Sequence, residues 1–500
     1  MRARAAEAST GALERYEAVI GIEIHCQLRT ASKMFCGCST KIDGAAPNSH
    51  CCPVCLGLPG VLPTINKSAV ECVIATGFAI EAAIAPTTRW DRKNYFYPDL
   101  PKGYQISQYQ LPLASNGRLT FDTSEGPFTV RINRAHLEED TGRLIHAELD
   151  ASPGGRPARR VSLIDFNRSG MPLMEIVTEP DIRTAEQARR YAEELRLLMR
   201  TIGASDAEME NGQMRVEANV SIRPRGREEF GTRVEVKNMN SMRSVERAIA
   251  FEIERQAVAI DAGRTIRMET RGWDEARQAT YMMRPKEAEN DYRYFPEPDL
   301  PPLVTSPEWL AEIKARLPEL PAARRNRYGT DLGLSAYDAG VIVNDAAATA
   351  LFEGALAADT GAPAKLIANW VTGEYMRLVK GEAGAGKVKA GELAALAKLV
   401  AAEAISGTNA KEVFAEHLDT GEPVARIIEK HGYRQISDAG ALGAAVEQAL
   451  AANPAAVADY RAGRDAAVGF LVGQVMKATR GQANATMVQA ALRERLDRAE

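Results

Sequence analysis

Cysteine is missing from most of this 500-residue chain, because all seven cysteines lie between Cys26 and Cys72. An odd number of clustered cysteines excludes a disulfide framework for a protein of this size and indicates a reducing compartment. Long apolar runs are missing too. No uncharged stretch approaches the ~18 residues of a membrane span, and residues 1–15 lack the apolar core of a signal peptide. The sequence therefore predicts a cytoplasmic protein that does not enter a membrane.

A strong net charge is also absent, since 62 Lys and Arg residues against 66 Asp and Glu residues leave a formal charge of −4. This balance excludes a polycation that binds nucleic acid through its overall charge, so any contact with RNA must come from a local patch. Apolar residues make up 45% of the chain, an ordinary globular composition, and the length predicts about three domains.

Alternation of apolar and polar residues predicts strands in the first part of the chain. Ile20, Ile22 and Ile24 would face one side of a strand, with Glu23 and His25 on the other side. The same alternation is cleaner over residues 214–223. Helices are predicted at residues 65–82, 184–202 and 241–260. This mixture predicts an α+β fold in which a sheet packs on helices.

Proline density marks a domain boundary at residues 296–302, which read PEPDLPP. The chain beyond this boundary is Ala-rich and helical, with turn signals near residue 406. We therefore predict four parts: a disordered extension at residues 1–15, an α+β domain at 16–302, a helical domain at 303–405 and a helical tail domain at 406–500.

Two closely spaced cysteine pairs predict a metal site. The motif CGC at residues 36–38 is followed by CPVC at residues 52–55, and four thiolates from two such pairs can surround one tetrahedral zinc ion. A shell closed by four protein ligands is typical of structural zinc. The alternatives are four thiols of no consequence, or Cys51 as a competing ligand, and Cys26 and Cys72 are expected in the core. The predicted ligands are Cys36, Cys38, Cys52 and Cys55.

Acidic residues on polar strand faces predict a second, different metal site. Glu23 and His25 share a face, Glu217 lies on another polar face, and HLEED at residues 136–140 contributes Glu138 and Glu139. Carboxylates with a single imidazole suit Mg²⁺, and nearby basic residues would complete a site for phosphoryl transfer. The alternative for each cluster is a solvated strand face or a structural ion pair. The basic candidates are Arg92, Lys93, Arg215, Arg223 and Lys237.

One glycine-rich string does not predict a phosphate loop. GEAGAGK at residues 381–387 matches the first part of that motif, but Val388 stands where a Ser or Thr would hold Mg²⁺. The preceding residues 365–380 are predicted as helix, whereas a phosphate loop must follow a strand. A flexible linker is the better interpretation. A glutaminase motif is also absent, so no hydrolase activity is predicted for this chain.

Eight strings together resemble a known family. In order along residues 16–490, the sequence resembles the B subunit of the bacterial aspartyl/glutamyl-tRNA amidotransferase. The matching strings are VIGIEIHCQL, CCPVCLGLPGVLP, DRKNYFYPDLPKGYQISQY, HLEEDTG, DFNRSGMPLMEIVTEPD, EVKNMNS, RYFPEPDLPPL and GFLVGQVMKATRGQAN.

The resemblance implies one member of a heterotrimeric, glutamine-hydrolysing carbon–nitrogen ligase. A glutaminase, the A subunit, would release ammonia from glutamine, and the C subunit would be a small stabilising protein. The B subunit would bind Glu-tRNA(Gln) or Asp-tRNA(Asn), phosphorylate the side-chain carboxylate with ATP, and form Gln-tRNA(Gln) or Asn-tRNA(Asn). The non-discriminating aminoacyl-tRNA synthetase is a candidate further partner. The implied fold is a cradle-like, glutamine-synthetase-like catalytic domain at residues 16–302, which includes the zinc knuckle, followed by two all-α domains.

The resemblance also implies roles for single residues. Glu23, His25 and Glu139 are the first expected Mg²⁺ ligands, followed by Glu138 and Glu217. Phosphate binding is expected from Lys93, Arg215 and Lys237, with Asn219 beside them at the nucleotide. The substrate pocket or the ammonia exit is expected at Tyr95, Tyr97 and Asp99.

The tail domain is expected to bind tRNA. Residues 461–500 contain seven Lys and Arg residues against four acidic residues, and we expect RNA contacts from Lys477 and Arg480. A mixed-charge helical surface is the alternative. Two other functions stay open from the residues: a non-catalytic, zinc-bearing tRNA-binding scaffold, and a free-standing ATP-dependent amide ligase that uses ammonium.

Overall fold

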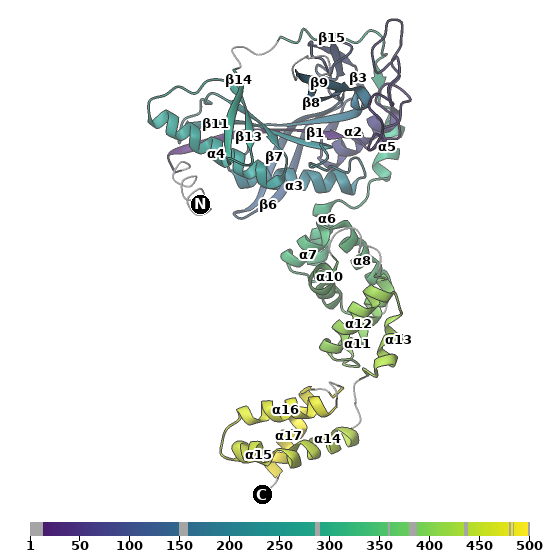
Figure 1. Ribbon diagram of the computed structural model, residues 1–500, viewed down its shortest axis with the longest axis vertical. Helices are drawn as coiled ribbons and strands as arrows, with labels where there is room; N and C mark the ends of the chain where they lie inside the picture. Colours follow the sequence, from purple (N-terminus) through teal and green to yellow (C-terminus); the bar gives the residue numbers. More distant parts are fainter. Residues whose placement is uncertain are drawn as a thin grey trace. The chain divides into compact units, whose positions relative to one another are not determined.

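The computed structural model describes residues 14–149, 159–285, 291–358, 361–379, 388–434, 439–479, 482–483 and 485–498. The predicted extension at residues 1–15 therefore lies almost wholly outside the described residues. The chain divides into two compact units, Met1–Leu320 and Pro321–Glu500. The first unit combines a sheet with helices, and the second is helical, as the α+β prediction requires (Figure 1).

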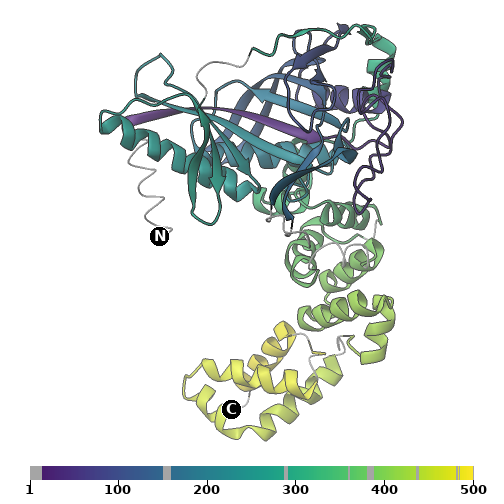
Figure 2. The same cartoon turned by 45° about the horizontal axis from the view of Figure 1, so that its top comes forward.

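The first unit is built on a sheet of twelve strands. Ten of them follow the order β14-β13-β12-β11-β1-β10-β7-β5-β4-β15, while β6 pairs with β7 and β2 pairs with β6. Figure 2 shows β1 running through the middle of this sheet. The strands are β1 (Tyr16–Gln27), β2 (Ala83–Ile84), β4 (Asp91–Asn94), β5 (Tyr104–Ser107), β6 (Ala114–Thr123), β7 (Gly126–Glu139), β10 (Pro172–Thr178), β11 (Met214–Pro224), β12 (Val234–Met239), β13 (Glu269–Asp274), β14 (Ala279–Pro285) and β15 (Phe295–Pro296).

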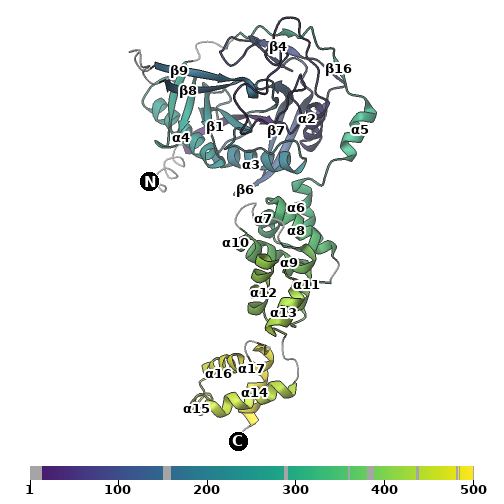
Figure 3. The same ribbon diagram turned by 45° about the vertical axis from the view of Figure 1, so that its right-hand side comes forward.

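Two small ribbons lie outside the main sheet. Strands β8 (Arg143–Leu149) and β9 (Arg159–Asp165) pair only with each other in the described chain, and Figure 3 shows their separate ribbon. Strands β3 (Thr87–Thr88) and β16 (Leu303–Val304) form the other ribbon. The helical elements of this unit are α2 (Lys67–Ala79), η1 (Phe166–Arg168), α3 (Ala185–Thr201), α4 (Met242–Asp261) and α5 (Pro307–Ala315).

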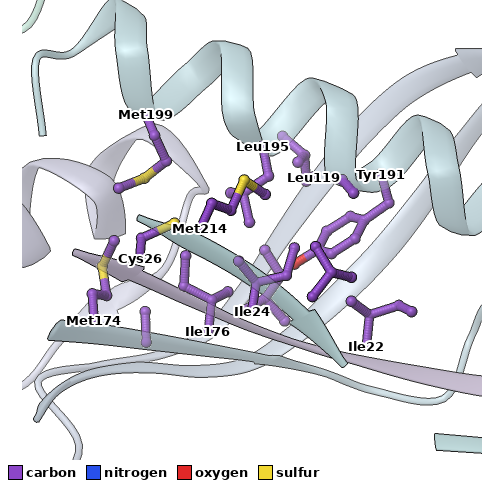
Figure 4. Close-up of a cluster of buried hydrophobic side chains, with 14 of the residues drawn as sticks. Ile22, Ile24, Cys26, Leu119, Met174, Ile176, Tyr191, Leu195, Met199 and Met214 are labelled. Carbon is purple, nitrogen blue, oxygen red and sulfur yellow. The ribbon is translucent and has the colours of Figure 1, made fainter. Parts of the chain in front are cut away.

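The predicted alternation gives the sheet one apolar face and one polar face. In β1, Ile22 and Ile24 are fully buried, whereas Glu23 and His25 point to the other side. Helices α3 and α4 lie along the apolar face (Figures 1 and 3). Figure 4 shows Tyr191 and Leu195 of α3 packed over Ile22 and Ile24. Burying the apolar face fixes the register, because a shift of one residue would turn every apolar side chain towards water.

The three predicted helices are confirmed, with caps that explain where each begins. Thr184 and Gln187 form a capping box at the start of α3, and the Ser241 side chain accepts a hydrogen bond from the Ser244 amide at the start of α4. Asn66 caps α2 in the same way. These caps satisfy amides that would otherwise lack partners in the first turn.

The first unit extends past the predicted boundary at residue 302. Helix α5 packs against α2, and the indole Nε1 of Trp309 donates a hydrogen bond of 2.9 Å to Glu71. Pro density therefore ends the sheet but does not end the unit, which includes residues to Leu320.

The second unit consists of helices. Helices α12 and α13 pack against α11, and the Val424 amide donates a hydrogen bond of 2.8 Å to Glu392. The predicted boundary at residue 406 thus falls inside a packed group, while α14 to α17 share a core of their own. The elements are α6 (Pro321–Thr330), α7 (Ala336–Val343), α8 (Ala346–Ala357), α9 (Ala364–Asn369), η2 (Trp370–Tyr375), α10 (Met376–Leu378), α11 (Ala390–Ala401), α12 (Gly407–Thr420), α13 (Val424–His431), α14 (Ala439–Ala452), α15 (Pro454–Arg461), α16 (Ala466–Ala478) and α17 (Ala485–Arg498).

In the described part of the chain, no single helix is long and apolar enough to cross a bilayer. Helices α7 and α8 have that length and apolarity only when taken together, and they are bent by 112° at the break between them. The glycine-rich string at residues 381–387 lies outside the described residues. The segment before it is helical through α9, η2 and α10, as predicted.

Candidate functional site

Antiparallel pairing brings acidic and imidazole side chains together on the polar face of the sheet. His25 in β1 pairs with Glu175 in β10 on one side and with Arg215 in β11 on the other. Glu175 in turn pairs with His136 in β7. Because paired residues project from the same face, the neighbouring strands β1, β10 and β7 place their acidic and imidazole side chains over one spot, with Arg215 of β11 beside them.

The resulting acidic cluster consists of Glu23, His25, His136, Glu138 and Glu175. Nε2 of His25 lies 3.6 Å from Oε1 of Glu23 and 3.6 Å from Oε2 of Glu175. Nε2 of His136 lies 3.5 Å from Oε1 of Glu138 and 3.6 Å from Oε2 of Glu175. Two sets of three potential metal ligands therefore share Glu175.

The electrostatics of the cluster favour a bound cation. Burial opposes the imidazolium form of His25, but Glu175, Glu23 and Glu217 together outweigh burial and raise the pKa of His25 to about 9. Burial and the charge of Glu175 raise the pKa of Glu23 to about 7. Burial also works against ionised Glu175, yet His136 and His25 hold the pKa of its carboxyl well below the usual range. The carboxylates thus keep a proton on His25, and a bound metal ion could take the place of that positive charge.

The donor set fits a divalent cation. Three carboxylates supply the oxygen ligands that Mg²⁺ prefers. The Nδ1 atoms of His25 and His136 are buried without a hydrogen-bond partner in the described residues, which is unusual for buried ring nitrogens. A cluster of this composition can hold a cation and, through it, an anionic ligand.

Basic side chains surround the acidic cluster. Lys237 lies 2.6 Å from Glu217 and 3.4 Å from Glu235, and Nη2 of Arg134 lies 3.3 Å from Oε1 of Glu175. Burial opposes the charged form of Lys93, but the surrounding charges, Glu138 first and Glu175 among the others, together outweigh burial and raise the pKa of the Lys93 ammonium. These cations lie where they can contact a negatively charged ligand at the cluster.

Several predicted residues are brought together and others are not. Glu23, His25, Glu138, Glu217, Lys93 and Lys237 converge on the polar face as described above. Arg215 borders the same face, with Nη2 3.2 Å from Oδ1 of the buried Asp140. Asn219 pairs with Gly21 of β1, four residues along β11 from Arg215 and on the same side of the strand.

Glu139 is not brought to the acidic cluster. Its carboxylate pairs with Lys102 and accepts a hydrogen bond of 3.0 Å from the Ile106 amide. Successive residues of a strand face opposite sides, so Glu138 takes the place beside His136. Glu139 instead lines a cavity of about 210 Å³ together with Lys102, Phe35, Cys55 and Asp299.

The predicted substrate residues are divided. Tyr95 and Tyr97 line, with Lys93 and Tyr292, a hollow of about 470 Å³. Tyr97 is exposed, whereas Tyr95 is half-buried with its ring 6.1 Å from Tyr292. Asp99 has a local structural contact, since its carboxylate accepts a hydrogen bond of 3.1 Å from Thr141.

The four predicted zinc ligands lie together. The Sγ atoms of Cys36, Cys38, Cys52 and Cys55 all lie within 4.8 Å of one another. This set forms the four-cysteine cluster. Cys51 is outside it, with its Sγ 3.9 Å from Oδ1 of Asn167. Cys26 is buried under the sheet and Cys72 is half-buried.

The tail carries fewer open cations than its composition indicates. Lys477 is exposed in the last turn of α16, and Arg480 lies outside the described residues. Arg464 pairs with Asp459 at 2.6 Å and Arg493 pairs with Asp465 at 3.0 Å. Part of the basic excess is therefore neutralised locally.

Sequence reasoning missed two members of the acidic cluster, Glu175 and His136. A signal for Glu175 exists, because it is the only charged residue in the run PLMEIVT of β10. Burying a carboxylate in a strand is costly unless it has a charged or hydrogen-bonding partner, so this single Glu is a candidate for the polar site. His136 is next but one to Glu138 and shares its face.

Comparison with known proteins identifies relatives along nearly the whole chain. The family model described as GatB/GatE catalytic domain matches residues 18–311, and the model described as GatB domain matches residues 350–496. Three relatives carry the name of the B subunit of aspartyl/glutamyl-tRNA(Asn/Gln) amidotransferase. The protein of Moorella thermoacetica is 49% identical over 484 residues, covering 96% of this chain and 100% of the relative. Those of Anaeromyxobacter sp. strain K and Picosynechococcus sp. are 50% and 48% identical, with 96% of this chain covered and 99% and 98% of the relatives.

Proposed function

Because the chain belongs to the family of aspartyl/glutamyl-tRNA(Asn/Gln) amidotransferase B subunits, we propose that it carries out ATP-dependent transamidation of misacylated tRNA. Its substrates are Glu-tRNA(Gln), Asp-tRNA(Asn) or both. The products are Gln-tRNA(Gln) and Asn-tRNA(Asn).

The proposed reaction has two steps. The side-chain carboxylate of the attached amino acid takes the γ-phosphoryl group of ATP, which yields an acyl phosphate and ADP. Ammonia then attacks the acyl carbon, the C–N bond forms, and the bond to the phosphate oxygen breaks. A proton and inorganic phosphate leave. Activation is needed because a carboxylate is a poor acyl donor, whereas phosphate is a good leaving group.

The acidic cluster is the observation that carries this proposal. Glu23, His25 and Glu175 would hold one Mg²⁺, and His136 and Glu138 with the shared Glu175 would hold a second. A bound Mg²⁺ supplies positive charge to the oxygens of a transferring phosphoryl group. Lys93 and Lys237 would bind phosphate oxygens from the opposite sides of the cluster, and Arg215 and Asn219 would bind the nucleotide.

The remaining parts of the molecule fit this function. The polar face would be the floor of a cradle related to that of glutamine synthetase, with Tyr95 and Tyr97 at its edge. The four-cysteine cluster would hold a structural zinc ion. The helices of the second unit would bind tRNA. Ammonia would come from the glutaminase A subunit, and a small C subunit would complete a cytoplasmic heterotrimer. A non-discriminating aminoacyl-tRNA synthetase would supply the misacylated tRNA.

Replacing Glu175 tests the assignment. In the reconstituted heterotrimer, Glu175→Gln is expected to abolish tRNA-dependent release of phosphate from ATP while tRNA binding persists, because the shared ligand is lost. Ammonium chloride as the nitrogen source separates this step from glutamine hydrolysis. The control is Asp122→Asn, because Asp122 is an exposed carboxylate of β6 beside the turn that joins β6 to β7. Unchanged phosphate release by Glu175→Gln would sink the catalytic role and favour the tRNA-binding scaffold.

Amide formation without tRNA tests the other open function, a free-standing amide ligase. A free-standing amide ligase would form glutamine or asparagine from free glutamate or aspartate, ATP and ammonium. We expect no such product with the isolated chain. Product formation without tRNA would contradict the proposed substrate.

A further inference from the structure

Lys33 is a fully buried lysine beside the four-cysteine cluster. Its side chain has no exposed surface. Its Nζ donates a hydrogen bond of 2.7 Å to the His50 carbonyl and lies 3.8 Å from Sγ of Cys55. Among the described residues, no carboxylate oxygen lies within 4.0 Å of this ammonium group.

A buried ammonium group needs an anionic neighbour, since transfer of an unpaired charge from water into a protein interior is costly. Lys102, another lysine of this unit with a nearly buried ammonium, pairs with the Glu139 carboxylate. In the described part of the chain, the group within 4.0 Å of the Lys33 ammonium that can carry negative charge is the Sγ atom of Cys55. Neutral thiols would not provide that charge.

We propose that Lys33 is the counter-cation of the four-cysteine cluster and a positioning residue for the metal bound there. The inference rests on the proposed zinc binding. A Zn²⁺ ion with four thiolates carries net negative charge, because its ligands outnumber its two positive charges. The Lys33 ammonium offsets part of this charge and donates an N–H to Cys55, as the outer partners of metal ligands commonly do.

The position of Lys33 also links the metal to the neighbouring cavity. An added Cβ at Gly170 would lie 3.3 Å from Cys55, 3.7 Å from Lys33 and 3.9 Å from the Glu139 carboxylate. Cys55, Lys33 and the Glu139 carboxylate therefore all approach Gly170 from the side on which a Cβ would lie. Cys55, Lys102 and Glu139 line the same cavity. Disturbance of the cluster should reach this cavity through direct packing.

The test is zinc affinity in the full chain, measured by competition with a chromophoric chelator. Lys33→Met keeps the volume and removes the charge, and we expect about 10- to 100-fold weaker zinc binding. Lys33→Arg keeps the charge and should recover most of the affinity. Lys41→Met is the matched control, because Lys41 lies in the same loop region but is exposed, and its zinc affinity should equal that of the wild type.

A second readout is the rate at which an alkylating reagent labels the four cysteines, followed by mass spectrometry. We expect faster labelling in Lys33→Met than in Lys41→Met. If Lys33→Met does not fold, Lys33→Gln replaces it, since an amide can still donate to the His50 carbonyl without bringing charge. A wild-type zinc affinity in the uncharged variant overturns the proposal.

Zinc affinity and transamidation test different sites of the protein. If the wild type holds zinc and Lys33→Met holds it equally well, the role of Lys33 is refuted while transamidation is untouched. If the wild type folds without zinc or another metal, the metal assignment and the role of Lys33 fall together, although the acidic cluster keeps its own test. Equal loss of zinc in Lys33→Met and Lys33→Arg would indicate packing rather than charge and would also refute the proposal.

Discussion

Glu175 of β10 lies directly opposite His25 of β1 in the antiparallel register, and its Oε2 atom is 3.6 Å from both the His25 and the His136 Nε2 atoms. One buried carboxylate therefore joins the two sets of ligands on the polar face. No single strand could provide this arrangement, because each strand contributes only every second residue to one face.

Glu138 and Glu139 should behave differently although they are neighbours in sequence. Glu138→Gln removes a carboxylate from the acidic cluster, so we expect the Mg²⁺ concentration for half-maximal phosphate release to rise at least about tenfold. Glu139→Gln leaves that concentration unchanged but strands the buried Lys102, with an expected loss of about 3–5 kcal/mol of stability. Mg²⁺ titrations and denaturant unfolding of both variants check this. The opposite pattern would show that Glu139 is the ligand.

The metal-free protein should lose stability as the pH rises above neutrality. The pKa of His25 is raised from 6.5 to about 9, so the folded protein holds this proton more tightly than the unfolded chain. The resulting stabilisation is complete below pH 6.5 and is lost as the pH rises towards about 9. It amounts to at most about 3 kcal/mol.

Unfolding midpoints in a chelating buffer, compared between the wild type and His25→Gln, report the contribution of His25 together with its coupling to Glu23 and Glu175, since titrating groups elsewhere in the chain cancel in the difference. The advantage of the wild type should shrink between about pH 6.5 and about pH 9. Added Mg²⁺ should flatten the dependence, because the cation replaces the proton. A difference that stays constant over this range would contradict the charged state assigned to His25.

Glu252 should be among the most costly single residues to remove from the first unit. Its carboxylate is fully buried and accepts hydrogen bonds from Arg255, Gln256 and Thr280. Glu252→Ala removes the acceptor of these three donors and leaves Arg255 only its longer contact of 3.6 Å with Glu269, so we expect a loss of about 3–5 kcal/mol. Glu254→Ala, a half-exposed position of the same helix, is expected to cost less than about 1 kcal/mol. Urea unfolding followed by circular dichroism checks both, and equal effects would refute the network.

Local patterns in the sequence predicted those features that depend on neighbouring residues. The period of two in β1 and β11 gave the two faces of the sheet, and the spacing of Cys36, Cys38, Cys52 and Cys55 predicted their cluster. The alternation within HLEED also carries information. Leu137 belongs to the apolar face, so its neighbours His136 and Glu138 share the polar face and Glu139 does not.

Other features depend on which distant segments pair, and a single sequence does not contain that information in local form. Glu175 joins the acidic cluster only because β10 lies between β1 and β7. The burial of Lys33 depends on the knuckle folding back over it, and a lysine in a loop is otherwise expected in water. The docking of α5 on α2 and of α13 on α11 depends likewise on contacts between segments distant in sequence.

The last four helices should contribute to tRNA binding as a separable module. Helices α14 to α17 have their own core, whereas α12 and α13 pack on α11. Ending the chain after residue 434 should therefore leave the remaining helices folded and weaken tRNA binding by about tenfold or more, with less dependence on salt. Glutaminase activity of the reconstituted heterotrimer should be unaffected.

Ending the chain after residue 405 should do more, because it also removes the partner of Glu392 and exposes the apolar side of α11. We expect this shorter chain to unfold at a lower temperature than the one that ends after residue 434. Lys477→Ala in the full chain is the milder test, since one exposed ammonium accounts for about one unit of the salt slope. Equal tRNA affinity of the full chain and the chain ending after residue 434 would place RNA recognition elsewhere, because the module would then be present without contacting the ligand.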